Sequence, residues 1–257
     1  MKKLIRFFLS VLFALSETAC NSSAQTVKTY GYKVEEALPH DVSSYTQGLF
    51  FYEGALYESA GQYGESNFRE VDLKTGKVLR RMNFDARYFA EGACVFDGRL
   101  YVLTWREKEC FVYDFKTWKQ VGTLRYPGEG WGLTTDGKSL IMSDGTSTLT
   151  FRSPETFAVE RTVEVTLHGK KVIYLNELEY YKGEVWANVY GTDQIVRIDP
   201  ATGVVRSVIN LNGLLPRHLW KPRTDVLNGI AFDAKGNLYV TGKYWPKMYR
   251  ITLVEKK

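Results

Sequence analysis

One feature constrains the fold of this chain more than any other, a repeat that recurs five times. The repeated segments contain "TQGLFF", "AEGACVF", "GWGLTT", "NELEYY" and "LNGIAFD". Gly48, Gly92, Gly132, Leu178 and Gly229 mark the same point in each segment, and they are separated by 44, 40, 46 and 51 residues. Such a period is typical of folds built from repeated structural units.

Each repeat has the pattern of four short strands. A hairpin signal such as Glu53-Gly54 or Asp97-Gly98 follows the first strand. A second strand comes next, for example "RLYVLTW", and two more follow, for example in "CFVYDFKTWKQVGTLRY". No segment has the periodicity of an amphipathic helix. The sequence therefore predicts an all-β fold, a five-bladed β-propeller.

The last repeat is one strand short, because the chain ends soon after "MYRITLV". The segment "TVKTYGYKVEEALP", before the first repeat, is an unassigned strand. We expect it to complete the last blade and close the ring, which removes open sheet edges. The prediction is a single domain over residues 27–257. Its longest insertion is residues 212–226, and loops of that length are often functional.

Residues 1–25 have the pattern of an export segment. A basic start is followed by the apolar stretch Leu4–Leu15, which is too short to span a membrane. Two processing sites compete. The sequence around Cys20 favours a lipoprotein, whereas the small residues ending at Ala24 suggest cleavage there. We therefore expect an exported protein, periplasmic or attached to a membrane through a lipid on Cys20, with secretion as the alternative.

The remaining cysteines, Cys94 and Cys110, are predicted to be free and buried. The repeat places them on non-adjacent strands, roughly 9 to 10 Å apart at the usual strand spacing. A disulfide needs Cα atoms about 4.4 to 6.8 Å apart. The net charge of +5 is modest and no long basic run exists, so nucleic-acid binding is not indicated. We expect a monomer.

The start of each first strand carries the strongest functional signal. In a propeller these strands line the central channel, so equivalent positions converge at one mouth. The adjacent position is glycine in four of the five repeats, whereas this position varies and is mostly polar. Residues that are merely solvated in a wet channel are the alternative interpretation. The five residues are Gln47, Glu91, Trp131, Glu177 and Asn228.

The second strands and their ends add further candidates. Aromatic rings beside polar groups are the usual composition of a small-ligand pocket. Burial would raise the pKa of a carboxyl such as Glu91, and a nearby Lys243 would oppose that shift, so the sequence leaves the direction open. These candidates are Glu58, Trp105, Asp144, Tyr190 and Lys243, with the rings of Tyr45 and Phe89.

Metal chemistry has no support in the sequence. His40, His168 and His218 lie far apart in predicted loops, and each is expected at the surface. No His/Cys cluster, Ser-His-Asp arrangement or phosphate-binding glycine loop is evident. We expect neither a metal nor a cofactor.

Several long motifs resemble one known family. They are "YTQGL", "YESAGQYGES", "FAEGA", "LTWREKECFVYD", "GEGWGLTTDGKSLIMSDGTSTL", "LNELEYYKGEVWANVYGTDQIVRIDP" and "VLNGIAFD" followed by "LYVTGKYWPKMY". In this order they resemble the plant and bacterial type of glutaminyl-peptide cyclotransferase (glutaminyl cyclase) over roughly residues 44 to 250. That family is a five-bladed propeller and is distinct from the zinc-dependent animal type.

The resemblance implies conversion of the N-terminal glutamine of peptides or proteins to pyroglutamate, with release of ammonia. It implies that Glu91 is the catalytic proton shuttle and that Glu58 is a further pocket candidate. Two motifs depart from the family, "FAEGAC" for the usual "FGEGLT" and "WANVYGTD" for "WANVWQTD". Tyr190 therefore replaces a pocket tryptophan and lacks its N–H donor. The other pocket positions that the resemblance implies are Gln47, Trp105, Trp131, Asn176 and Lys243.

A mechanism follows as a hypothesis. Glu91 takes a proton from the attacking amine and returns it to the leaving nitrogen. Lys243, Asn176 and indole N–H groups are the candidate donors to the oxyanion. Two other hypotheses remain open, a non-catalytic propeller that binds peptides or glycans and a metal-dependent lactonase-like propeller.

Overall fold

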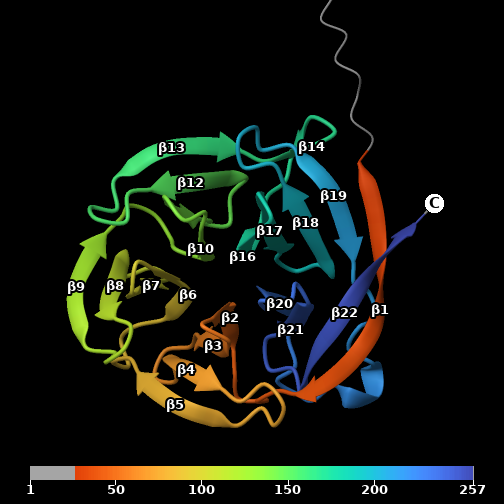
Figure 1. Ribbon diagram of the computed structural model, residues 1–257, viewed down its shortest axis with the longest axis horizontal. Helices are drawn as coiled ribbons and strands as arrows, with labels where there is room; N and C mark the ends of the chain where they lie inside the picture. The colour runs from red at the N-terminus through yellow and green to blue at the C-terminus, as the bar shows by residue number, and fades with distance from the viewer. Residues whose placement is uncertain (1–26, 257) are drawn as a thin grey trace, which may run out of the picture.

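The computed structural model describes residues 27–256, and nearly all of its regular structure is β-strand. Figure 1 shows the strands gathered in groups around a centre, with β2, β6, β10, β16 and β20 innermost. This is the all-β, β-propeller-like architecture that the repeat predicts. A single turn of 3-10 helix, η1 (Arg217–Leu219), lies in the insertion before the last repeat.

Three groups are separate four-stranded sheets whose strands follow one another in sequence. The first contains β2 (Thr46–Tyr52), β3 (Ala55–Ala60), β4 (Asn67–Val71) and β5 (Val78–Asn83). The second contains β6 (Ala90–Phe96), β7 (Arg99–Thr104), β8 (Glu109–Asp114) and β9 (Gln120–Arg125). The third contains β10 (Leu133–Thr135), β11 (Leu140–Met142), β12 (Thr148–Arg152) and β13 (Val159–Glu164).

The other strands form one eight-stranded sheet in the order β16-β17-β18-β19-β1-β22-β21-β20. A two-stranded hairpin of β14 (Thr166–Leu167) and β15 (Lys170–Lys171) lies between β13 and β16 in the chain. The eight strands are β1 (Lys28–Pro39), β16 (Leu175–Tyr181), β17 (Glu184–Val189), β18 (Gln194–Ile198), β19 (Val205–Asn210), β20 (Leu227–Phe232), β21 (Leu238–Gly242) and β22 (Lys247–Lys256).

β1 makes two sets of contacts in this sheet. It pairs antiparallel with β22, from Thr29 opposite Lys256 to Pro39 opposite Lys247. It also pairs parallel with β19 over a short stretch that includes Lys28 opposite Ser207. The repeat pattern does not predict this second pairing, which joins two groups of strands through their outer edges.

The inner hairpins have the geometry that their sequences predict. Glu53-Gly54 has φ values of 49° and 84°, and Lys182-Gly183 has 49° and 82°. Two consecutive positive φ values are the mark of type I′ turns, whose twist matches that of the flanking strands. The second position needs a residue without a Cβ to adopt this conformation at little cost, and glycine stands there in both.

Apolar side chains fill the spaces between neighbouring groups of strands. Five clusters occur among the described residues, and each includes side chains from two adjacent groups. Phe50 and Phe68 of the first sheet pack with Val95 and Leu100 of the second, for example. Leu49 in turn packs with Ala231 of β20, so the seams continue around the whole ring.

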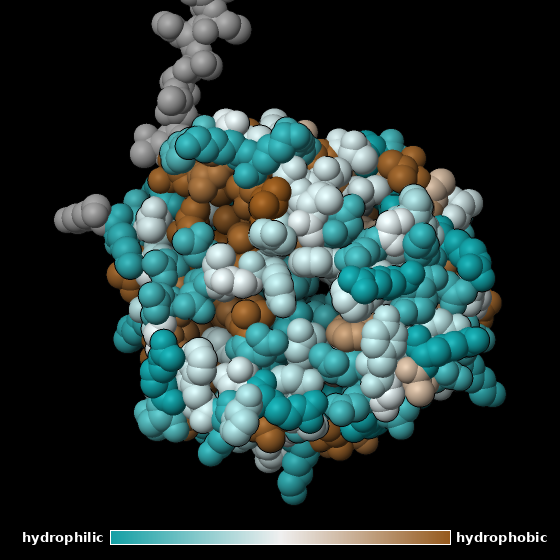
Figure 2. Space-filling model, turned by 180° about the vertical axis from the view of Figure 1, so that it is seen from behind, coloured by the Kyte–Doolittle hydropathy of each residue, from teal (hydrophilic) through white to brown (hydrophobic). Residues whose placement is uncertain are grey.

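Two further expectations concern cysteines and membranes. Cys94 and Cys110 are buried and free, which confirms that prediction. Within residues 27–256, no helix is long and apolar enough to cross a bilayer. The proposed export segment, with Cys20 and Ala24, lies outside the described residues. On the face opposite to that of Figure 1, apolar side chains gather in a hollowed area at the upper left of the view (Figure 2).

Candidate active site

The inner strands are irregular where they approach the channel mouth. The register shifts between Thr46 and Gly48 in β2 and between Ala90 and Ala93 in β6. Similar shifts occur between Leu175 and Leu178 in β16 and between Leu227 and Ile230 in β20. Such bulges bend a strand and redirect its side chains. Gln47, Glu91, Asn176 and Asn228 all stand at these irregularities.

The glycines beside these positions allow the inner strands to touch. A Cβ on Gly132 would lie 2.0 Å from the Asn176 carbonyl oxygen, and one on Gly92 would lie 2.4 Å from the Leu133 nitrogen. The Gly92 N–H donates to the Trp131 carbonyl at 2.7 Å. Glycine recurs at this position because neighbouring inner strands pack too closely for a Cβ. The close packing brings together the variable residues that precede these glycines in adjacent repeats.

A pocket of about 390 Å³ opens at this mouth. Nine of the predicted site residues line it, including all three that were assigned a catalytic role. Gln62 and Tyr63, which the sequence analysis did not single out, line it as well. The nine are Tyr45, Gln47, Phe89, Glu91, Trp105, Trp131, Asn176, Tyr190 and Lys243.

Glu91 is the buried acid of the pocket, with only 4% of its surface exposed. Its Oε1 accepts one hydrogen bond, from Gln47 Nε2 at 2.9 Å. Burial raises the pKa of its carboxyl well above the usual range, and the attraction of Lys243 only partly offsets this shift. This settles the direction that the sequence left open. Glu91 can therefore exchange a proton far more readily near neutral pH than an ordinary glutamate.

Lys243 is the buried base of the same pocket. Its Nζ lies 4.4 Å from the centre of the Tyr45 ring and 5.1 Å from that of Tyr190. Burial lowers its pKa to about 8, although Glu91 and Asp225 attract the charged form. The two ring faces favour the ammonium form as well. Tyr190 thus provides the ring that the resemblance expects from a tryptophan.

Aromatic rings form the walls of the pocket. Phe89 lies 5.4 Å from Trp105, and Trp131 lies 5.7 Å from Tyr190, measured between ring centres. Both indole N–H groups donate to Glu129 Oε2, at 2.7 Å from Trp105 and 3.0 Å from Trp131. Both indole N–H groups are therefore engaged in this arrangement, which favours Asn176 and Lys243 among the candidate oxyanion donors.

Glu58, a predicted substrate-binding residue, does not line the pocket. It is 1% exposed and lies behind Tyr45, where it accepts hydrogen bonds from Ser44 Oγ and Thr46 Oγ1. His40 Nε2 lies 3.1 Å from the same oxygen. Burial raises the pKa of Glu58, but His40, Arg69 and these hydrogen bonds outweigh it and bring the pKa down to about 2.

Glu177 and Asn228 also lie outside the pocket lining. Glu177 accepts the backbone N–H groups of Leu49 and Ile230, at 3.3 and 2.9 Å, and so satisfies the inner edges of two other strands. Asn228 donates to the Thr46 carbonyl at 2.9 Å. The irregularity in β16 explains the offset of Glu177, because it directs the preceding residue, Asn176, into the pocket.

The missed residues had weak signals in the sequence. Gln62 and Tyr63 follow the second strand of the first repeat, where Gln62 has a φ of 114° that is rare for a side-chain-bearing residue. Tyr63 donates to Glu107 Oε1 at 2.8 Å. Glu129 precedes Trp131 by two residues, so its position next to that indole was within reach of sequence reasoning.

The histidines divide into two kinds. His168 and His218 are exposed, as predicted. The prediction for His40 is wrong, because it is 8% exposed and its ring nitrogens contact Glu58 and the Trp245 carbonyl. Within residues 27–256, no three or more His, Cys, Asp or Glu side chains form a group that could hold a metal ion.

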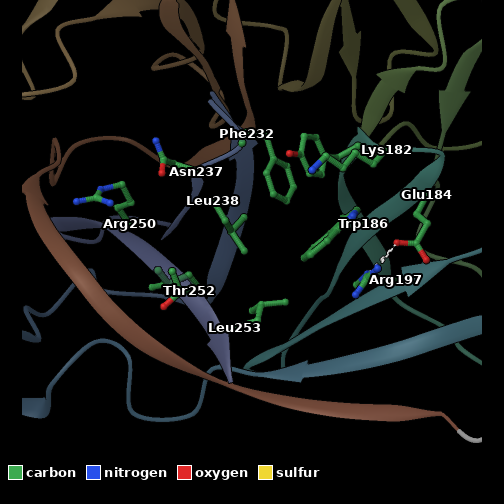
Figure 3. A pocket seen from close by; sticks show the side chains of 13 residues that line it. Lys182, Glu184, Trp186, Arg197, Phe232, Asn237, Leu238, Arg250, Thr252 and Leu253 are labelled. Carbon is green, nitrogen blue, oxygen red and sulfur yellow. Dashed lines mark hydrogen bonds and ion pairs between the residues drawn. The ribbon is translucent and has the colours of Figure 1, made fainter. Parts of the chain in front are cut away.

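A second hollow, of about 270 Å³, lies at the other ends of β16 and β20 (Figure 3). Its aromatic side chains pack on one another, with Tyr181 and Phe232 stacked at 3.7 Å between ring centres. Glu184, its carboxylate, is paired with Arg197 at 2.5 Å. Without a buried unpaired acid or base, this hollow has less chemical capacity than the pocket around Glu91.

Known proteins resemble this chain in both sequence and structure. The model of a family described as glutamine cyclotransferase matches residues 7–253. A glutaminyl-peptide cyclotransferase from Arabidopsis thaliana is 45% identical over 227 residues, which cover 86% of this chain and 71% of that protein. The crystal structure of a glutaminyl cyclase from Myxococcus xanthus has a TM-score of 0.84 at 34% identity, covering 90% of this chain and 100% of that one.

A more distant likeness concerns the fold alone. The WD40 β-propeller domain of Doa1 gives a TM-score of 0.50 at 14% identity, covering 81% of this chain and 63% of that one. The family match and the plant relative each extend over most of the chain, and the motifs around the pocket lie inside the family match. The chain belongs to the glutamine cyclotransferase family.

Proposed function

We propose that this protein converts the N-terminal glutamine of peptides or proteins to pyroglutamate and releases ammonia. Family membership supports this function, as do the names of the plant relative and the Myxococcus structure. The observation that carries it is the pairing of Glu91 and Lys243. A buried acid with a raised pKa beside a buried base with a lowered pKa suits proton transfer near neutral pH.

The proposed chemistry needs one proton carrier. The substrate's α-amine attacks its own γ-amide carbonyl carbon, so that a C–N bond forms and the carbonyl electrons move to oxygen. Glu91 accepts the proton that the amine loses. When the oxyanion collapses, the other C–N bond breaks and Glu91 returns the proton to the departing nitrogen, which leaves as ammonia.

The remaining pocket residues orient Glu91 and the substrate and stabilise the oxyanion. Asn176 and Lys243 provide the donors for the oxyanion, since both indoles are engaged by Glu129. Gln47 fixes the carboxyl of Glu91 through its hydrogen bond. The aromatic walls favour the bent side chain that ring closure requires. Glu58, Glu177 and Asn228 lie outside the pocket lining, so they take no direct part in substrate binding. These residues supply proton transfer and charge stabilisation, so the proposed reaction needs no metal.

The fold is proposed to be a five-bladed propeller whose last blade consists of β20, β21, β22 and β1. The five apolar clusters support five blades, and the long antiparallel pairing of β1 with β22 supports this closure. A single domain over residues 27–257, a monomeric state and export are also proposed. For export, both processing sites, at Cys20 and after Ala24, remain under consideration.

Ammonia release tests the function directly. A peptide that begins with glutamine should release one ammonia per molecule and lose its free amine, with or without a chelator. The matched peptide with glutamine in second position should release none. If the protein binds the first peptide without releasing ammonia, it is a binding module. If a chelator abolishes release, the metal-independent mechanism is wrong.

A further inference from the structure

A buried charged cluster lies behind the pocket, and the proposed chemistry does not use it. We call it the Glu58 cluster, and it consists of Glu58, His40, Arg69, Ser44 and Thr46. Glu58 Oε1 is 3.1 Å from His40 Nε2, 2.5 Å from Ser44 Oγ and 2.6 Å from Thr46 Oγ1. Arg69 Nε lies 3.8 Å from Glu58 Oε2. The side chains of His40, Glu58 and Arg69 are 2% exposed or less.

His40 is positively charged in this cluster. Its Nδ1 lies 2.7 Å from the Trp245 carbonyl oxygen, and its Nε2 faces the Glu58 carboxylate. Both partners are acceptors, and a neutral imidazole has only one N–H to donate. Burial lowers the pKa of His40, but Glu58 and the Trp245 carbonyl raise it further, so the net shift is upward despite the nearby Arg69. His40 and Arg69 thus both face the Glu58 carboxylate, and Arg69 also pairs with Asp41 at 2.7 Å.

The cluster and the pocket share one short segment of chain. Ser44 and Thr46 direct their hydroxyls at Glu58, whereas the alternating residues Tyr45 and Gln47 line the pocket. Side chains that alternate along an extended segment face opposite sides. A shift of the segment toward or away from Glu58 must therefore move Tyr45 and Gln47 as well.

The two pocket-lining residues of this segment contact Glu91 and Lys243. Gln47 donates to Glu91, and the Tyr45 ring lies beneath the Lys243 ammonium. The Ser44 carbonyl also accepts the N–H of Tyr244, the residue after Lys243, at 2.7 Å. Glu58 is therefore linked to Glu91 and Lys243 through the short segment of residues 44–47, and each link is a direct contact or a chain neighbour.

We propose that Glu58 is a positioning residue for the reaction, acting through Ser44 and Thr46 to hold Tyr45 and Gln47 against Lys243 and Glu91. The inference rests on the proposed function. It predicts that weakening the cluster affects turnover, because a small displacement of positioned groups has a large effect on the rate. Substrate binding depends mainly on the aromatic walls and should change less.

Thr46→Val tests this proposal without removing a charge. It deletes one hydrogen bond to Glu58 and keeps the shape of the side chain, whereas Thr46→Ser keeps the hydroxyl. We expect Thr46→Val to lower kcat about 10-fold with a smaller change in KM, and Thr46→Ser to remain near wild type. Thr134→Val is the matched control, because Thr134 is a buried threonine with one hydrogen bond, to the Tyr180 N–H, on another inner strand.

A second measurement does not depend on turnover. The pKa of Lys243, followed by NMR, should shift in Thr46→Val and stay unchanged in Thr46→Ser and Thr134→Val. If wild type releases no ammonia but this shift occurs, the proposed function fails, although Glu58 still positions Tyr45 beside Lys243. If wild type is active and Thr46→Val changes neither kcat nor the Lys243 titration, the cluster only stabilises the fold and the proposal is overturned.

Discussion

Glu58 and Glu91 are two buried carboxyl groups on neighbouring sheets, and they behave in opposite ways. Each has less than 5% of its surface exposed. The pKa of Glu58 falls to about 2, whereas that of Glu91 rises well above its usual range. Glu58 has three hydrogen-bonding partners on one oxygen and an arginine near the other, whereas Glu91 has Gln47 and the attraction of Lys243.

Burial alone therefore does not decide what a carboxyl group can do. It raises the pKa of both residues, because a charge is less stable away from water. At Glu58 enough donors and cations compensate, and the group stays ionised. At Glu91 compensation is incomplete, and the group can gain and lose a proton. The first environment suits a fixed anchor and the second suits a proton carrier.

The largest expected effect comes from breaking the fixed carboxylate. Glu58→Gln leaves His40 buried without its counter-ion and leaves Arg69 paired with Asp41 alone. Breaking a buried pair in this way costs about 3–5 kcal/mol of folding free energy. Urea unfolding at pH 7 measures the loss. The control is Glu255→Gln, which removes the exposed pair with Lys28 and should leave stability unchanged. Equal stability of the two variants would contradict the role given to Glu58.

Replacing Glu91, the proposed proton carrier, should lower turnover. Glu91→Gln keeps the size of the side chain but removes its proton transfer, so kcat should fall about 10²-fold or more. Glu177→Gln is the matched control, because Glu177 is also buried with a raised pKa but lies outside the pocket. Initial rates of ammonia release decide the outcome. A Glu91→Gln enzyme with near wild-type turnover excludes Glu91 as the shuttle.

The pH dependence of folding stability should distinguish Glu58 from Glu91. The lowered pKa of Glu58 contributes stability that is present above pH 4.5 and is lost as the pH falls toward 2. The raised pKa of Glu91 means that the folded protein holds this proton more tightly than the unfolded chain. Its contribution therefore declines as the pH rises above 4.5.

Unfolding measured across this range checks both signs. Relative to wild type, Glu58→Gln should lose its disadvantage as the pH falls from 4.5 toward 2. Glu91→Gln should gain stability relative to wild type as the pH rises above 4.5. Parallel pH profiles for wild type and the two variants would show that the two environments do not differ.

Glu129 has an environment intermediate between those of Glu58 and Glu91. Its replacement should have the smallest effect of the variants. Its side chain is 37% exposed, and its hydrogen bonds to Trp131, Trp105 and Arg106 lower its pKa against the effect of burial. Glu129→Gln removes the charge that holds both indoles, so KM should rise about 2- to 10-fold while kcat changes little. Steady-state kinetics separate the two constants. A fall in kcat at constant KM would place Glu129 in the chemistry instead.

The sequence predicts the strands and turns of the fold well because the same pattern recurs from repeat to repeat. Strand periods, hairpin glycines and the glycines of the inner strands all carry local signals. The variable position beside those glycines located Glu91 and Trp131 for the same reason. Residues that share a repeat position then share an approximate place in space.

The failures arise where contacts depend on a single irregular segment. Gly61, not Glu58, occupies the repeat position of Trp105 and Lys243. Glu58 lies three residues earlier, where residues 40–46 cover it and supply its donors. No repeated sequence pattern predicts that the His40 side chain is buried there. The offset at Glu177 depends on a bulge, and a shift of one residue exchanges the two faces of a strand.

The pairing of β1 with β22 sets Thr29 opposite Lys256, so the first and last strands of the described chain run side by side. A short linker between them would join covalently two strands that are now held together by hydrogen bonds. New ends could then be opened at the Lys182-Gly183 turn, at the opposite end of β16 from Asn176. Such a circular permutant should keep the pocket intact, because the contacts that build it do not depend on the repeat with which the chain begins.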